Sequence, residues 1–434
     1  MADEGTTDVA EVEQRRDAPD RRLQPVILGG DIGAYSLART FHEAYGVRAV
    51  VVSTVSTGLV RHSRILTNVV EPRMDEPDAV VARLHAIADQ HADADLILMG
   101  SADWLVRTIV EQRSRLEDRY TIPYTTRERL DLVTDKESFG RLCGELGLAH
   151  PTTVVHDVGS GGVPDTAHLR FPVIAKTGNT AAYHLVEFPG KKKVFTVDTP
   201  EELTALLEKV RASGYTDTFV IQDMIPGDDS GMRILTCYSD RDGRVRFACF
   251  GDVLLEEHTP GALGNPAGII TGPGHELVAQ ATRLLEHIGW TGWANFDLKH
   301  DPRDGRTVFF ELNPRLGRSN FYITSAGQNT AEITVREHVQ GLDPLPEGAA
   351  TELTTEHLYT VLPKRLLLRY LADPALGERV RRLWRSRRVT NPLWYRHEWD
   401  PRRVAYLVVA QLNQFRKYGT HYPVEVWRAA GGRP

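Results

Sequence analysis

A turn signal between two segments of alternating apolar and polar residues constrains the fold of this chain most strongly. The turn is Asp301-Pro-Arg-Asp-Gly305, and the alternation on both sides of it predicts an antiparallel hairpin. Successive side chains of a strand point to opposite faces, so the hairpin sets Asp297 roughly opposite Glu311 and adds Asn313 to the same face. The apolar alternates are expected to face a core. They are Ala294, Phe296, Leu298 and Leu312.

The three polar residues of this hairpin offer a set of hard oxygen ligands. The carboxylates of Asp297 and Glu311 are expected to converge with the amide oxygen of Asn313. Oxygen ligands of this kind suit Mg²⁺, which keeps several waters and shares its shell with substrate phosphates. The alternative is that each acidic residue only lies on the solvent-exposed face of the hairpin. The convergence favours the metal site.

The size and composition of the chain predict a globular protein of several domains. A chain of 434 residues is too long for one core, which indicates two or three domains. With 41% hydrophobic and 25% charged residues, the composition is typical of a soluble globular protein. The formal net charge of −6 gives no reason to expect nucleic-acid binding. The sequence does not determine the oligomeric state.

The cysteines and the hydrophobic segments predict a cytoplasmic protein. Cys143, Cys237 and Cys249 show no ligand or redox spacing, so buried thiols in a reducing compartment are expected. The first residues lack a basic start followed by an apolar run, and no stretch reaches the roughly 20 apolar residues of a membrane-spanning helix.

The N-terminal part predicts an α/β domain over residues 24–125. Residues 1–23 have no apolar period and are expected to be a disordered tail. The apolar run after them enters Gly29-Gly-Asp-Ile-Gly33, a helical pattern and a second strand, which is a β-Gly-α-β unit. Its glycine spacing is not the dinucleotide fingerprint. A later strand ends in Gly100-Ser-Ala-Asp103, at the carboxyl edge of the predicted parallel sheet, where small-molecule substrates bind.

The character of the sequence changes near residue 125, and α+β lobes are predicted over residues 126–345. Capping boxes begin helices at Thr134-Asp-Lys-Glu137 and Thr199-Pro-Glu-Glu202. A strand over 171–176 ends in Lys176, and another is predicted over 219–225.

Residues 346–434 predict a helical C-terminal region rich in lysine, arginine and aromatic residues. One interpretation is a helical appendage whose basic face is solvated. The other is a surface for an anionic substrate, such as a nucleotide-linked precursor, or for an anionic membrane face.

The order of chemistry-bearing residues resembles the ATP-grasp fold. The residues in that order are Lys136, Lys176, Gln222 to Gly227, Asp297, Glu311 and Asn313. Within that superfamily, four segments look like the D-aspartate ligase branch, whose members join a free amino acid to the side-chain amine of a peptidoglycan precursor stem. The four segments are Ile27–Gly46, Val220–Arg233, Ala294–Lys299 and Gly317–Phe321. The resemblance covers residues 24 to 345 and implies ATP and Mg²⁺ as cofactors.

The resemblance also implies roles for single residues in nucleotide binding. Lys136 and Lys176 would contact the ATP phosphates. The segment from Gln222 to Ile225 would be the hinge, where backbone groups of Asp223 and Ile225 bond the adenine edge. A further position, Asp229, would hold the ribose hydroxyls. Each assignment has an alternative. Lys136 could be a surface lysine at the start of a helix, Lys176 a lysine of an edge strand, and the segment that ends in Asp229 a plain turn.

The expected chemistry is the activation of a carboxylate. An amine cannot displace oxide from a carboxylate at useful rates, so an acyl phosphate is expected, with the two lysines and Mg²⁺ neutralising charge. Arg315, Arg318 or Arg233 would stabilise the tetrahedral oxyanion or hold the second carboxylate of a diacid. The sequence does not divide these roles among the three arginines, and any of them could be a surface residue.

The sequence departs from the branch's pattern near the expected carboxylate pocket, at Pro314 and Leu316 and in Gly33-Ala-Tyr. These departures leave the amino acid open. The leading hypothesis is therefore a ligase with D-aspartate as the first donor to test. The alternatives are a peptide ligase of secondary metabolism with other substrates and a nucleotide-binding partner protein without turnover.

Overall fold

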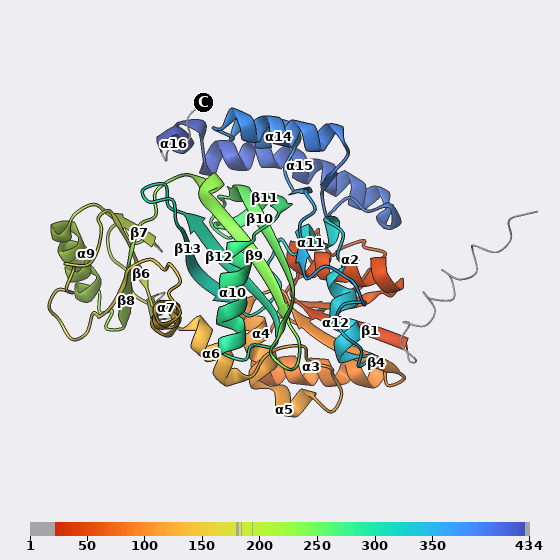
Figure 1. Cartoon of the computed structure of the whole chain (residues 1–434). Helices are drawn as coiled ribbons and strands as arrows, with labels where there is room; N and C mark the ends of the chain where they lie inside the picture. Colours follow the sequence, from red (N-terminus) through yellow and green to blue (C-terminus); the bar gives the residue numbers. More distant parts are fainter. Residues whose placement is uncertain (1–21, 179–181, 184, 193, 430–434) are drawn as a thin grey trace, which may run out of the picture. The chain divides into compact units, whose positions relative to one another are not determined.

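The computed structural model describes residues 22–178, 182–183, 185–192 and 194–429 (Figure 1). The chain divides into two compact units. The larger contains Met1–Thr134, Asp228–Asp297 and Leu312–Pro434, and the smaller contains Asp135–Gly227 and Leu298–Glu311. The predicted disordered tail lies outside the described residues except at its last two positions, where the first strand begins. The predicted domain boundaries near residues 125 and 345 stay predictions.

The N-terminal part of the large unit is a four-stranded parallel sheet in the order β3-β2-β1-β4. This confirms the predicted β-Gly-α-β unit. The strands are β1 (Arg22–Leu28), β2 (Ala49–Ser53), β3 (Leu66–Val70) and β4 (Ala94–Gly100); the helices are α2 (Ile32–Tyr45), α3 (Pro77–Gln90), α4 (Asp103–Glu111), α5 (Arg113–Leu116) and α6 (Arg127–Thr134). All carboxyl ends of these strands lie at one edge of the sheet, since the strands are parallel.

A second sheet follows the order β13-β12-β9-β10-β11-β15-β16, with β14 beside β10. Its strands are β9 (Met232–Ser239), β10 (Val245–Glu257), β11 (Asn265–Gly272), β12 (Gly292–His300), β13 (Thr307–Asn313), β14 (Glu352–Leu353), β15 (Leu358–Thr360) and β16 (Val389–Thr390). Strands β12 and β13 are neighbours, and the N–H of Gly305 donates to the carbonyl of Asp301 at 2.9 Å, so the predicted hairpin is confirmed. Its apolar alternates are buried, as expected.

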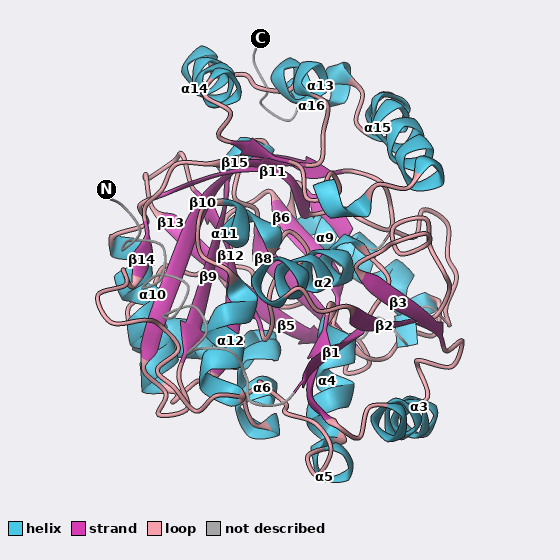
Figure 2. Ribbon diagram, turned by 90° about the vertical axis from the view of Figure 1, so that its right-hand side faces the viewer, coloured by secondary structure: helices cyan, strands magenta, loops and turns pink. Residues whose placement is uncertain are grey.

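Helices complete the large unit. The C-terminal ones, α14, α15 and α16, lie together beside the edge of the second sheet that holds β11 and β15 (Figures 1 and 2). The prediction of a helical C-terminal region is therefore confirmed. The helices are α10 (Glu276–His287), α11 (Phe321–Ser325), α12 (Thr330–His338), α13 (Lys364–Arg369), α14 (Pro374–Arg385), α15 (Pro401–His421) and α16 (Val424–Ala429), with short 3₁₀ turns η1 (Asp229–Gly231) and η2 (Arg396–Glu398).

The small unit holds an antiparallel sheet in the order β5-β8-β6-β7. Its elements are β5 (Thr153–Asp157), β6 (Val173–Thr177), β7 (Val194–Val197), β8 (Thr218–Asp223), α7 (Lys136–Glu145) and α9 (Pro200–Ala212). Thr199 caps α9 as predicted, since its hydroxyl accepts from the N–H of Glu202. The predicted cap of α7 is wrong by one residue: Asp135, not Thr134, accepts from the N–H of Ser138.

The three cysteines are free and buried in this fold. Burial raises the pKa of the Cys143 thiol to about 12, so this group stays protonated at neutral pH. The prediction of buried thiols is therefore confirmed.

Candidate active site

Two of the predicted arginines reach the carboxyl edge of the parallel sheet. Arg315, which follows β13, donates to Asp103 at 2.8 Å, directly after β4. Arg318 lies 3.4 Å from Asp31, which follows β1, and donates to Glu257 at the end of β10 over 2.6 Å. Arginines and carboxylates therefore meet at the edge where small molecules bind in sheets of this type.

A glycine lets the arginine segment approach helix α2. A Cβ on Gly33 would lie 3.2 Å from the Cα of Arg318, which is closer than most real contacts. The side-chain amide of Asn320 donates to the carbonyl of Gly33 at 3.2 Å and fixes this approach. Asp31 is held in place as well, because it caps α2 and accepts from the N–H of Ala34. A glycine at position 33 thus permits the close approach of the arginine segment to α2.

The acidic residues keep both guanidinium groups charged although they are largely buried. Burial alone would lower the pKa of Arg315, but Asp103 and, further away, Asp297 and Asp31 outweigh burial and raise it. In the same way, burial would lower the pKa of Arg318, and Glu257 with Asp31 raises it. Both arginines are fixed cations in a partly dry environment, where a bound carboxylate would be held strongly.

Asp297 and Asn313 lie side by side in the large unit. The amide nitrogen of Asn313 donates to Oδ2 of Asp297 at 3.0 Å, and the amide nitrogen of Asn295 approaches Oδ1 at 3.4 Å. The amide oxygen of Asn313 accepts from Arg315 at 3.4 Å, so this pair adjoins the arginine cluster. A carboxylate beside an amide is a donor set that fits Mg²⁺, provided that the amide of Asn313 turns its oxygen toward the ion. Across the residues described, no three His, Cys, Asp or Glu side chains gather as a metal site.

The third predicted metal ligand, Glu311, belongs to the small unit. Its carboxylate lies 3.5 Å from the ammonium group of Lys136, the first residue of α7. Both side chains are partly exposed, at 47% and 36%. The two residues that the resemblance assigns to metal and to phosphate are therefore paired with each other in this structure.

Lys176 is half-buried and lies on the face of the small sheet that points away from its core. The buried face packs against the core formed with α9 and includes Val173, Ala175, Phe219 and Ile221. Strand alternation places Ile174 and Lys176 on the opposite face, opposite the exposed residues Thr196 and Val194 of β7.

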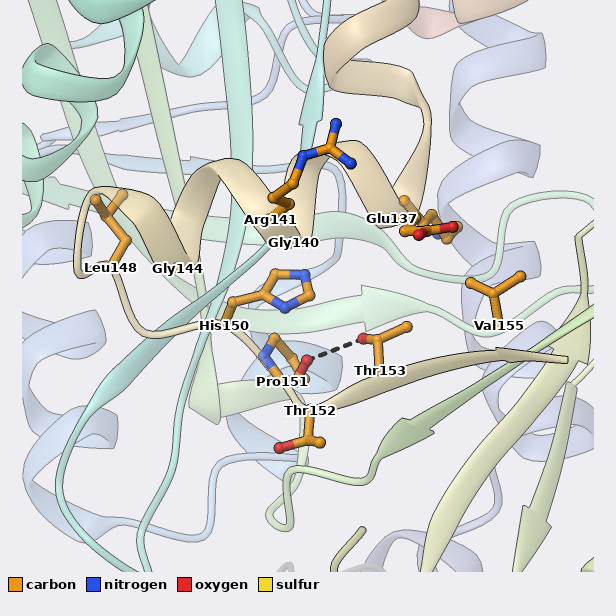
Figure 3. A pocket seen from close by; sticks show the side chains of 11 residues that line it. Glu137, Gly140, Arg141, Gly144, Leu148, His150, Pro151, Thr152, Thr153 and Val155 are labelled. Carbon is orange, nitrogen blue, oxygen red and sulfur yellow. Dashed lines mark hydrogen bonds between the residues drawn. The ribbon is translucent and has the colours of Figure 1, made fainter. Parts of the chain in front are cut away.

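A cavity of about 460 Å³ lies beside this face, between α7 and β5 (Figure 3). Lys136 and Arg141 of α7 bring two cationic side chains to it, and Thr153 brings a hydroxyl. Figure 3 shows the ring of His150 directed toward Gly140, whose missing Cβ would lie 3.0 Å from that ring. The pKa of His150 is lowered by burial, so the ring is neutral at pH 7.

The predicted hinge residues end β8 in the small unit. The amide of Gln222 donates to the Thr153 hydroxyl at 2.9 Å, and this ties the hinge strand to the cavity. The N–H of Asp223 already donates to the carbonyl of Thr152 at 3.0 Å. Ile225 is buried. The backbone N–H of Asp223 is therefore already engaged within the small unit.

Asp229 and Arg233 have structural partners in the large unit. The carboxylate of Asp229 accepts from the N–H of Glu256 at 2.9 Å and lies 2.8 Å from Nε2 of His258. Arg233 pairs with Asp252 at 3.0 Å. It is not among the arginines that reach the carboxyl edge of the parallel sheet. Its predicted role and that of Asp229 stay predictions.

The carboxylates that face the arginines were not singled out in the sequence. Asp31 and Asp103 carried a usable signal, because each follows a glycine at the end of a predicted parallel strand. Glu257 carried none, since it ends a long strand whose burial becomes clear only in the structure. His150 and Thr153 also had no signal.

No protein-family model matches the chain. D-aspartate ligase from Enterococcus faecium (strain Aus0004) is 30% identical over 404 residues, which cover 91% of this chain and 96% of that protein.

Two solved structures show a similar fold. L-amino acid ligase from Bacillus licheniformis has a TM-score of 0.52 at 15% identity, covering 74% of this chain and 75% of that one. The biotin carboxylase domain of Hydrogenobacter thermophilus 2-oxoglutarate carboxylase, in complex with MgADP, ADP and bicarbonate, has a TM-score of 0.54 at 13% identity, covering 78% and 74%.

Proposed function

The chain belongs to the D-aspartate ligase family and has the ATP-grasp fold of ATP-dependent carbon-nitrogen ligases, and from this premise we propose that it activates D-aspartate and joins it to an amine of a peptidoglycan precursor. The observation that carries the proposal is the cluster at the carboxyl edge of the parallel sheet. There Arg315 and Arg318 face Asp103, Asp31 and Glu257.

This cluster has the charge pattern of an amino-acid site. A free amino acid brings an ammonium group and at least one carboxylate. The planar guanidinium groups of Arg315 and Arg318 suit carboxylates, which they can hold through two parallel bonds. Asp31 and Asp103 supply negative charge for the ammonium group. Two arginines match the two carboxylates of aspartate, and this supports a diacid as donor.

The reaction proceeds by transfer of a phosphoryl group to the donor carboxylate. A carboxylate oxygen attacks the γ-phosphorus of ATP, ADP leaves, and an acyl phosphate forms. The amine of the acceptor then attacks the acyl carbon, loses a proton, and expels phosphate as the amide bond forms. The guanidinium of Arg315, beside Asn313, is the fixed cation closest to the metal pair and is suited to stabilise the oxyanion.

The remaining predicted residues hold the nucleotide. Lys136 and Lys176 neutralise phosphate charge in the small unit, where phosphoryl transfer needs mainly positioning and electrostatic stabilisation. Mg²⁺, for which the sequence resemblance names Asp297, Asn313 and Glu311 as ligands, would supply further neutralisation of the phosphate oxygens. Gln222, Asp223 and Ile225 bind the adenine, and Asp229 the ribose.

The decisive experiment measures ADP release by the purified chain with ATP and Mg²⁺. D-aspartate, L-aspartate and D-asparagine are compared as donors, each with and without a UDP-linked muramyl pentapeptide. Turnover that needs both D-aspartate and the pentapeptide supports the proposal. Turnover with another donor or acceptor identifies a ligase of other substrates, such as one of secondary metabolism. The absence of turnover with every pair favours a nucleotide-binding partner protein.

A further inference from the structure

Helix α15, Pro401–His421, exposes an apolar stripe over its middle part, from Val408 to Phe415. Val409 and Leu412 are each 64% exposed, and Trp399, just before the helix, is 65% exposed. Val408 and Phe415 extend the stripe at a spacing of three to four residues, which places these side chains on one face. Isolated exposed apolar residues are common, but a continuous stripe marks an interaction surface.

The same face is positively charged. Helix α15 contains three arginines, one lysine and one histidine and no aspartate or glutamate. Arg402 and Arg416 are exposed on either side of the stripe. Arg402 interacts electrostatically with Asp400, which caps the helix, whereas no carboxylate partner is described for Arg416 in the part of the chain that the structure covers. Lys417 is half-buried and lines a small pocket with Glu257.

The arginines of the neighbouring helix α14 behave differently. Arg381 and Arg385 pair with Glu378, and Arg382 pairs with Glu356. On α15, in contrast, the exposed Arg416 at the end of the apolar stripe has no carboxylate partner among the described residues.

The opposite face of α15 anchors the helix firmly. Arg403 is fully buried and pairs with Glu398 at 2.8 Å, while Leu407 and Tyr418 are buried in the core. Gln411 donates to the carbonyl of Val361 at 2.8 Å. Because the inner face is fixed by these contacts, the exposed stripe cannot be covered by rotation of the helix.

We propose that the outer face of α15 docks on an anionic membrane surface. None of the described helices is long and apolar enough to cross a membrane, and α15 has the pattern of a helix that lies in the interface instead. The apolar stripe would enter the boundary between head groups and acyl chains, where Trp399 also fits. The exposed Arg402 and Arg416 complement anionic lipid head groups. This proposal is independent of the substrates of the ligase.

Vesicle flotation with the full chain tests the proposal. The protein is expected to float with vesicles of phosphatidylglycerol and phosphatidylcholine at low salt, and much less with phosphatidylcholine alone. The double variant Val409→Glu/Leu412→Glu should lower the partition coefficient at least about tenfold, because it places charge in the apolar boundary. Arg416→Gln should lower it about fivefold. Val163→Glu, an equally apolar exposed position in the small unit, serves as the matched control and should float like the wild type.

Three outcomes would overturn the proposal. The first is flotation that the double variant leaves unchanged. The second is equal flotation with neutral and anionic vesicles. The third is no flotation at all; light scattering would then show whether the stripe holds a second copy of the chain, as a dimer that the double variant separates. Circular dichroism and thermal unfolding confirm that each variant is folded.

Discussion

Asn313 donates a hydrogen bond from its side-chain amide nitrogen to the carboxylate of Asp297, at 3.0 Å. The amide thus places a partial positive charge where a cation would be held, and its oxygen faces Arg315. If this pair holds a divalent ion, as we propose, the amide has to rotate by half a turn, and the ion then replaces this hydrogen bond.

Glu311→Gln is expected to abolish turnover while leaving the fold intact. The change removes one negative charge from the metal set at nearly constant shape, and the side chain is half exposed, so little packing is lost. Because even residues that only orient metal ligands cost 10- to 100-fold in activity or affinity, kcat should fall at least about a hundredfold. ADP release measures it, with Glu208→Gln on α9 as the control. A kcat equal to that of the wild type at an ordinary Mg²⁺ concentration would show that Glu311 is not a metal ligand.

Lys176→Met should weaken ATP binding with little effect on stability. The substitution keeps the length of the side chain and removes its charge from the face of the small sheet that points away from its core. A hydrogen bond to a charged group contributes roughly 1.5–3 kcal/mol, so KM for ATP should rise by about one to two powers of ten. Steady-state kinetics measures the effect, and Lys209→Met on α9 is the matched control. An unchanged KM for ATP would show that Lys176 does not contact the nucleotide.

Arg318→Lys should raise KM for the amino-acid donor about tenfold while the charge stays in place. Lysine keeps the attraction to Asp31 and Glu257 but loses the planar fork that holds a carboxylate through two bonds. The donor titration is done at saturating ATP, and KM for ATP should stay as in the wild type. An effect on both KM values would indicate a general disturbance of the site.

Gly33→Ala should destabilise the protein by about 1–3 kcal/mol, because the added Cβ meets the backbone of Arg318 at 3.2 Å. The control is Gly419→Ala in α15, where nothing lies within 4 Å of a new Cβ. That change should stabilise the helix by up to about 1 kcal/mol. Chemical denaturation of both variants measures the difference. Equal midpoints would show that the Gly33 approach carries no constraint.

His338 should make the protein less stable as the pH falls from about 6.5 to about 4. Burial lowers the pKa of His338 to about 4, and the charges of Arg241 and Arg113 add to this. The unfolded chain takes up a proton near pH 6.5, so stability falls over that range by about 3 kcal/mol and the loss is complete below pH 4. Above pH 6.5 the effect vanishes. Chemical denaturation over this pH range measures the free energy of unfolding as a function of pH. This free energy should fall less steeply with falling pH in His338→Asn than in the wild type. Equal slopes would show that other groups cause the acid sensitivity.

The sequence predicted those parts of the fold that depend on local signals. The turn residues Asp301–Gly305 are typical of a hairpin connection, so the hairpin could be predicted from them. The glycines after β1 are typical of the loop between a strand and a helix, and they indicated the parallel sheet. The cap of α7 was misplaced because Thr134 and Asp135 are both good capping residues and only the backbone direction separates them.

The partners in the candidate site were harder to predict. Arg318 meets Asp31 and Glu257, which lie far from it in the chain, so no periodicity connects them. The exposed stripe of α15 had the same difficulty, since an amphipathic pattern indicates two faces but not which partner covers each of them.

The pairing of Arg318 with Asp31 and Glu257 also affects how the site distinguishes an amino-acid donor from similar acids without an amine. The guanidinium of Arg318 and its two carboxylates together carry a net negative charge, and an amino acid that enters exchanges partners with them: its carboxylates take the arginines, and its ammonium group takes the acids that are released. A dicarboxylic acid without the amine, such as succinate, would leave those acids unpaired in a partly dry site. Such acids should therefore be poor inhibitors.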